Sequence, residues 1–153
     1  MLRYVLFCVM SLLPVAVQAQ QQSMTITCDD SVEGAPGEEV SIPLTLQHAS
    51  ALAGMQVNVA VEDTTVGAFR GFELTDTVAD EMIQDGAFKV IGKRGIAVAL
   101  PRARVYKQSI LVRLRFQLKK SGKTPVHLRI ALAEGDNPPV SKRYTLRPVL
   151  IAR

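Results

Sequence analysis

Residues 110–118, I-L-V-R-L-R-F-Q-L, constrain the fold more than any other part of the chain because their side chains alternate in character. One parity is wholly apolar and consists of Ile110, Val112, Leu114, Phe116 and Leu118. The other parity is mostly polar and holds Leu111, Arg113, Arg115 and Gln117. A β-strand sends successive side chains to opposite faces, whereas arginines two residues apart would break the apolar stripe of a helix. The pattern predicts a strand with one buried face, which needs a second apolar layer to cover it.

Eight further segments have the alternation or composition of strands, and runs of turn residues separate them. The nine expected strands are residues 24–28, 40–46, 55–61, 66–74, 87–91, 96–100, 110–118, 126–132 and 144–151, the last interrupted by Pro148. Turns or loops are expected at 29–39, 48–53, 101–108 and 135–141, and at most one helical turn at 76–84. This spacing predicts an all-β fold, a nine-stranded antiparallel β-sandwich with jelly-roll topology.

The first residues have the features of a secretory signal peptide. Arg3 supplies a positive charge, residues 4–17 are almost wholly apolar, and Ala19 ends a sequence that suits signal peptidase. The apolar run is shorter than the roughly 20 residues that a membrane-spanning helix needs. We therefore expect a signal peptide at 1–19, one domain at 20–153, a secreted or periplasmic location, and no membrane association after cleavage.

Cys28 is the only cysteine that remains after cleavage, because Cys8 lies in the signal peptide. An intramolecular disulfide is then impossible, so the fold must depend on packing. Cys28 shares its parity with Met24 and Ile26, which predicts a buried thiol in the first strand; pairing with another chain is the alternative.

Charge is divided unevenly along the sequence. Residues 20–91 hold twelve acids and two bases, whereas residues 92–153 hold fifteen bases and two acids. Two interpretations stay open: the basic half binds an anionic partner, or acidic and basic strands lie side by side and their fields cancel. Export argues against nucleic acid as the partner.

The sequence offers little that could support catalysis. His48 and His127 are its only histidines, and no metal-binding, nucleophile-elbow or phosphate-loop motif is present. We expect no enzyme activity, no bound metal and no cofactor. An exposed cluster is expected instead in the basic loop, where Arg102, Arg104, Tyr106 and Lys107 could grip an anionic glycan or an acidic protein; an ordinary solvated loop is the alternative.

Four segments in order carry a resemblance to a known family. They are 34–44 (GAPGEEVSIPL), 52–57 (LAGMQV), 95–100 (GIAVAL), and 110–119 followed by 124–128 (TPVHL). Together they resemble a cohesin domain, within the wider group that includes the family 2 and family 3 carbohydrate-binding modules. Cohesins are nine-stranded jelly-roll sandwiches that bind calcium-loaded dockerin modules through a sheet face containing the third and sixth strands.

Carried over by position, that face consists here of Gln56, Asn58 and Ala60 from the third strand and Ala97 and Ala99 from the sixth. The resemblance implies a secreted, non-catalytic module that binds a protein partner, of dockerin type or in a surface assembly. The alternative is a carbohydrate-binding module for extracellular or cell-wall polysaccharide, linked to polysaccharide catabolism.

Overall fold

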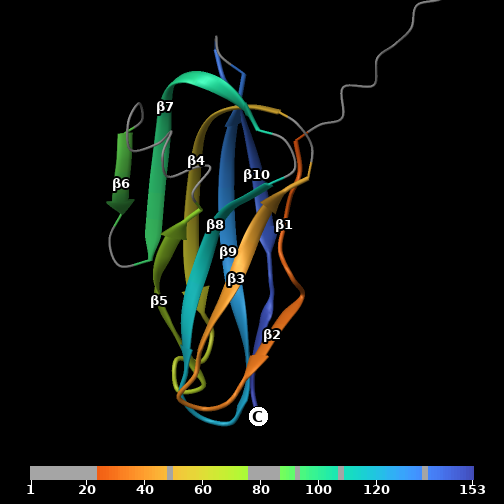
Figure 1. Cartoon of the computed structure of the whole chain (residues 1–153), viewed down its shortest axis with the longest axis vertical. Helices are drawn as coiled ribbons and strands as arrows, with labels where there is room; N and C mark the ends of the chain where they lie inside the picture. The colour runs from red at the N-terminus through yellow and green to blue at the C-terminus, as the bar shows by residue number, and fades with distance from the viewer. Residues whose placement is uncertain (1–23, 48–49, 76–86, 92–93, 107–108, 136–137) are drawn as a thin grey trace, which may run out of the picture.

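The computed structural model describes residues 24–47, 50–75, 87–91, 94–106, 109–135 and 138–153, and these form strands and turns without any helix. Eleven strands lie in two stacked sheets (Figure 1). Their bounds are β1 Ile26–Thr27, β2 Ser31–Gly34, β3 Glu39–Leu46, β4 Ser50–Val61, β5 Gly67–Leu74, β6 Ala87–Ile91, β7 Gly95–Tyr106, β8 Ser109–Leu118, β9 Gly122–Glu134, β10 Val140–Leu146 and β11 Val149–Ala152. The predicted all-β sandwich is confirmed. The expected signal peptide and the 76–84 segment lie outside the described residues.

The smaller sheet has the order β1-β3-β8-β5, so β8 lies in its interior. Val112, Leu114, Phe116 and Leu118 of β8 are fully buried, while Arg115 is exposed and forms an ion pair with Glu39 of β3 at 2.9 Å. The alternation of apolar and cationic side chains in β8 thus divides the core from solvent as predicted.

Leu111 is an exception to this alternation. It shares the parity of Arg113 and Arg115 but is fully buried, so the expectation that it points outward is wrong. The register explains the difference: Leu44 pairs with Val112 and Thr45 pairs with Ile110, which leaves Leu111 as an extra residue in β8. A β-bulge of this kind shifts the facing of the strand by one residue and turns Leu111 toward the core.

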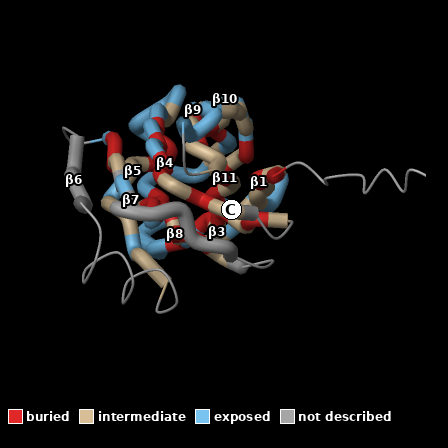
Figure 2. The backbone as a smooth tube through the Cα atoms, turned by 90° about the horizontal axis from the view of Figure 1, so that it is seen from above, coloured by how far each residue is buried: buried red, intermediate tan, exposed pale blue. Residues whose placement is uncertain are grey.

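The larger sheet has seven strands in the order β2-β11-β9-β4-β7-β6, and β10 also pairs with β9. Alternate residues of β4 (Met55, Val57, Val59) and of β9 (Val126, Leu128, Ile130, Leu132) are buried. They meet the apolar side of β8 and β3 between the two sheets, and in Figure 2 the buried positions follow both layers. The intervening residues of the two strands point away from the core.

All nine expected strands have a counterpart, and the two additional strands have simple causes. The expected turn at 29–39 contains β2, which pairs with β11 in parallel, so the sheet is not purely antiparallel. The expected last strand is divided around Pro148 into β10 and β11. Proline has no amide hydrogen to donate to a neighbouring strand, which favours a break at this position. The expected turn at 48–53 is wrong for residues 50–53, since β4 begins at Ser50.

The uneven charge along the sequence is partly cancelled within the fold. Among the described residues, three arginine ion pairs join the acidic first half to the basic second half: Arg115–Glu39, Arg147–Glu62 and Arg153–Glu33, at 2.9, 3.0 and 2.8 Å. Each lies between exposed side chains, so each contributes little to stability. Their effect is to neutralise part of the basic surface.

Candidate binding face

The outward-pointing residues of β4, β7, β9 and β10 form one continuous surface, here called the outer face. It consists of Gln56, Asn58 and Ala60 of β4, Ala97 and Ala99 of β7, His127, Arg129, Ala131 and Ala133 of β9, and Ser141, Arg143 and Thr145 of β10. The neighbouring residues of opposite parity in β4 and β9 are buried. Side chains on the outer face therefore point away from the core, toward solvent or a partner.

The structure places the five residues that the resemblance assigns to a binding face on one side of the larger sheet. Gln56 pairs with Ala97 across β4 and β7, and Gly54 pairs with Ala99. Gln56, Asn58, Ala60 and Ala99 are exposed and Ala97 is half-buried. Their role in binding stays a prediction, because their position alone does not identify a ligand.

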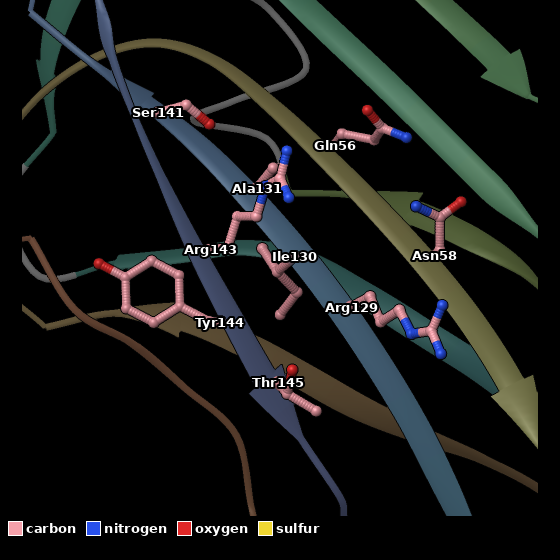
Figure 3. A pocket seen from close by; sticks show the side chains of 9 residues that line it. All are labelled: Gln56, Asn58, Arg129, Ile130, Ala131, Ser141, Arg143, Tyr144 and Thr145. Carbon is pink, nitrogen blue, oxygen red and sulfur yellow. The ribbon is translucent and has the colours of Figure 1, made fainter.

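A groove with a volume of about 410 Å³ lies in the outer face over β4, β9 and β10. The residues that line it are Gln56, Asn58, Arg129, Ile130, Ala131, Ser141, Arg143, Tyr144 and Thr145 (Figure 3). Gln56 and Asn58 stand on β4, and Arg129 extends from β9 toward Asn58. The Arg143 side chain lies over Ala131, whose small methyl group leaves room for it.

Arg129 and Arg143 are exposed, and neither forms an ion pair with any described residue. Arg143 pairs with Ala131, and Thr145 pairs with Arg129, so the two arginines are diagonal neighbours across β9 and β10. Diagonal Cα atoms of this kind lie about 7–8 Å apart, within reach of long side chains. The groove thus contains two cationic side chains on adjacent strands, and none of the residues that line it is an acid.

A separate polar cluster lies beyond the end of β4. Oε2 of Glu62 accepts hydrogen bonds from Nε2 of His127 and from Nη2 of Arg147, both at 3.0 Å. These hydrogen bonds, first from His127 and then from Arg147, hold the pKa of the Glu62 carboxyl below its usual value of 4.5. Arg147 is therefore neutralised within the fold, unlike Arg129 and Arg143.

The expected basic loop is wrong for most of its length. Residues 101–106 continue β7, with Arg104 paired to Leu52 and Tyr106 paired to Ser50 of β4, so Arg102, Arg104 and Tyr106 belong to a strand. Proline has no amide hydrogen to donate to a neighbouring strand. Pro101 does not interrupt β7 because neither neighbour pairs with it: the pairing with β4 skips from Ala99 to Arg104, and the pairing with β6 ends at Ala99. Lys107 lies outside the described residues.

Seven of the nine residues that line the groove lie outside the binding face expected from the sequence: Arg129, Ile130, Ala131, Ser141, Arg143, Tyr144 and Thr145. The alternation of β9 indicates which of its residues point outward, but it does not place them on the same face as Gln56. The expected loop at 135–141 ends at Ser141 and so conceals the alternation of Ser141, Arg143 and Thr145 along β10. That alternation is the signal in the sequence for the outward β10 residues of the groove.

The described residues contain no group of three or more His, Cys, Asp or Glu side chains arranged to hold a metal ion. Nor does this part of the chain form an apolar helix of the length required to cross a membrane. Cys28 is half-buried and packs beside the core, and burial, followed by the nearby Asp29 and Asp30, raises the pKa of its thiol to about 11. A thiol with so high a pKa is a poor nucleophile at neutral pH.

No protein-family model and no curated protein matches the chain. Solved structures do match. The sixth cohesin of scaffoldin B from Acetivibrio cellulolyticus, solved with a Cel5 dockerin mutant, is 15% identical, with a TM-score of 0.63 over 85% of this chain and 99% of that one. A type I cohesin–dockerin complex of OlpA from Clostridium thermocellum gives 14% identity and a TM-score of 0.62 over 86% of this chain and 99% of that one.

The likeness extends to a cohesin that is not part of a cellulosome. A non-cellulosomal cohesin from the archaeon Archaeoglobus fulgidus is 12% identical, with a TM-score of 0.55 over 85% of this chain and 91% of that one. The matched structures are thus covered almost completely by this chain. At such low identity the likeness establishes a shared fold and leaves the partner to be argued from the chain's own residues.

Proposed function

We propose that this chain, which has the fold of a cohesin module, is a secreted and non-catalytic protein-binding module whose partner docks on the outer face. Two of the matched structures are complexes with dockerins, which supports a protein partner for this fold. A dockerin-type module is accordingly the first partner to test. The apolar first residues support secretion.

The observation that carries the proposal is the shape and chemistry of the outer face. Small residues form its floor, since Ala97, Ala131 and Ala133 flank the β4 residues Gly54 and Gln56 in register. A low floor lets the backbone of a partner approach the sheet. The polar groups of Gln56, Asn58, Ser141 and Thr145 stand around it and supply hydrogen-bond donors and acceptors, as the polar parts of protein interfaces do.

The proposal is tested by measuring binding of the purified chain to a panel of calcium-loaded dockerin modules by isothermal titration calorimetry. Asn58→Phe places a bulky neutral side chain on the outer face and should weaken binding at least about tenfold. Ser41→Phe is the matched control: Ser41 is also exposed on a strand and also stands opposite an arginine, Arg115, as Asn58 stands opposite Arg129. The control should bind like the native chain.

Equal loss in both variants, or no loss in Asn58→Phe, would contradict docking on the outer face. If no dockerin binds, gel retardation on neutral and anionic polysaccharides distinguishes a module for another protein partner from a carbohydrate-binding module. Retardation on a glycan without any protein partner would favour the carbohydrate-binding alternative and remove the present proposal.

A further inference from the structure

Arg129 and Arg143 line the same groove, and neither forms an ion pair with a described residue. Three other described arginines do form ion pairs: Arg147 with Glu62, Arg153 with Glu33, and Arg115 with Glu39. Others, such as Arg70 and Arg113 of the smaller sheet, form none with a described residue. Lys142, the neighbour of Arg143 in β10, forms an ion pair with Glu134 at 2.5 Å. Arg129 and Arg143 instead lie diagonally across β9 and β10, with no ion pair to a described residue.

The outer face also lacks acids. Its residues as defined above include no Asp and no Glu, and the nearest carboxylate in sequence to β4, that of Glu62, is already paired with Arg147 and His127. An anionic group bound in the groove would supply the carboxylate partner that neither Arg129 nor Arg143 has among the described residues.

We propose that the outer-face groove recognises an acidic segment of the protein partner, whose carboxylates pair with Arg129 and Arg143. This inference rests on the proposed function and specifies the chemistry of the partner. Guanidinium groups form paired hydrogen bonds with carboxylates, and such charge-assisted bonds are roughly twice as strong as neutral ones. Gln56 and Asn58 lie across the groove from the two arginines and can bind the amide groups of the same segment.

The lining of the groove favours a peptide over a polysaccharide. The outer-face residues as defined above include no aromatic side chain on which a sugar ring could stack. Tyr144 contributes to the groove wall, but its ring points away from the two arginines in Figure 3. Its hydroxyl donates a hydrogen bond to the carbonyl oxygen of Met24, at 2.5 Å, on the other side of β10.

The inference is tested with synthetic probes of defined charge on the full chain. A fluorescent peptide of alternating Asp and Gly is compared, by anisotropy, with a Lys–Gly peptide of equal length and with polygalacturonate. The native chain should bind the Asp–Gly peptide in preference to both. Replacement of Arg129→Ala together with Arg143→Ala should weaken that binding about tenfold or more. Arg143→Lys keeps the charge but loses the paired hydrogen bonds of the guanidinium group. Its affinity for the Asp–Gly peptide should therefore lie between that of the native chain and that of the double variant.

The matched control is Arg70→Ala with Arg113→Ala, which removes the same charge from the smaller sheet, where neither arginine forms an ion pair with a described residue. It should bind the Asp–Gly peptide like the native chain. Equal weakening in both double variants would show a general effect of net charge and overturn the inference. So would tighter binding of polygalacturonate with the same dependence on Arg129 and Arg143, or no binding of the acidic peptide.

The two proposals fail in different ways. If a dockerin binds and Asn58→Phe abolishes its binding while the Arg129→Ala, Arg143→Ala variant binds normally, the outer face is the docking site and the acidic partner is wrong. If the acidic peptide binds through both arginines but no protein module does, the recognition chemistry holds and the dockerin-type partner is wrong.

Discussion

The bulge at Leu111 leads to a sharp prediction about stability. On sequence parity, Leu111 belongs with Arg113 and Arg115 on the solvent side of β8, whereas the structure buries it completely. Leu111→Ala should therefore destabilise the protein as a core substitution does. Arg115→Ala, four residues away on the same parity, should not.

The expected magnitudes follow from burial. Complete burial of a leucine side chain stabilises a protein by about 1.5–3 kcal/mol, and truncation to alanine adds the cost of the cavity left behind. For Leu111, which has no exposed surface, the loss should be about 2–4 kcal/mol, a large share of a typical stability of about 5–15 kcal/mol. The ion pair that Arg115→Ala removes lies between side chains 44% and 45% exposed, so its loss should cost less than about 1 kcal/mol.

Urea unfolding monitored by circular dichroism provides the measurement, with Leu114→Ala as the positive control because Leu114 is fully buried on the expected parity. Leu111→Ala and Leu114→Ala should both lower the unfolding midpoint substantially, with unchanged slopes. A Leu111→Ala variant within about 0.5 kcal/mol of the native chain would behave like a surface substitution. That result would refute the bulge and restore simple alternation along β8.

Three further predictions concern polar groups. Thr124, fully buried, accepts a hydrogen bond at 2.8 Å from a backbone amide in the β4–β5 turn, so Thr124→Val should cost about 1–2 kcal/mol in the same unfolding assay, and a neutral result would contradict the bond. The carboxyl of Glu62 should titrate below 4.5 in NMR, and Arg147→Ala or His127→Ala should raise its pKa. Because its folded-state pKa is lowered, any stability it adds is present at neutral pH and is lost as pH falls through that lowered value; an unmoved titration would exclude the hydrogen bonds. Cys28, with a pKa of about 11, should react with a thiol reagent at pH 8 far more slowly than free cysteine, and its rate should keep rising up to about pH 11. A rate like that of free cysteine would contradict its burial.

The candidate site was predictable only in part. The outward parity of Gln56 and Asn58 follows from β4 alone, since Met55 and Val57 alternate with them and are buried. That Arg143 would reach the same groove could not be read from the sequence, because it depends on β10 pairing with β9 and not with another strand. Local alternation states which way a side chain points relative to its own strand, and carries no information about which strand lies alongside.

The sequence by itself determined the all-β class, the approximate positions of nine strands and the side of β8 that enters the core, because a two-residue period of apolar side chains leaves one face that must be buried. The tertiary structure decided the exceptions. Leu111 is buried because the register of β3 skips it and turns its side chain toward the core. Residues 101–106 can continue β7 through Pro101 because neither β4 nor β6 pairs with Pro101, so its missing amide hydrogen costs no ladder hydrogen bond. It also decided which arginines are neutralised: Arg147 lies beside Glu62, while Arg129 and Arg143 lie beside each other. Such pairings join residues far apart in the chain, and only the arrangement of the strands in space brings them together.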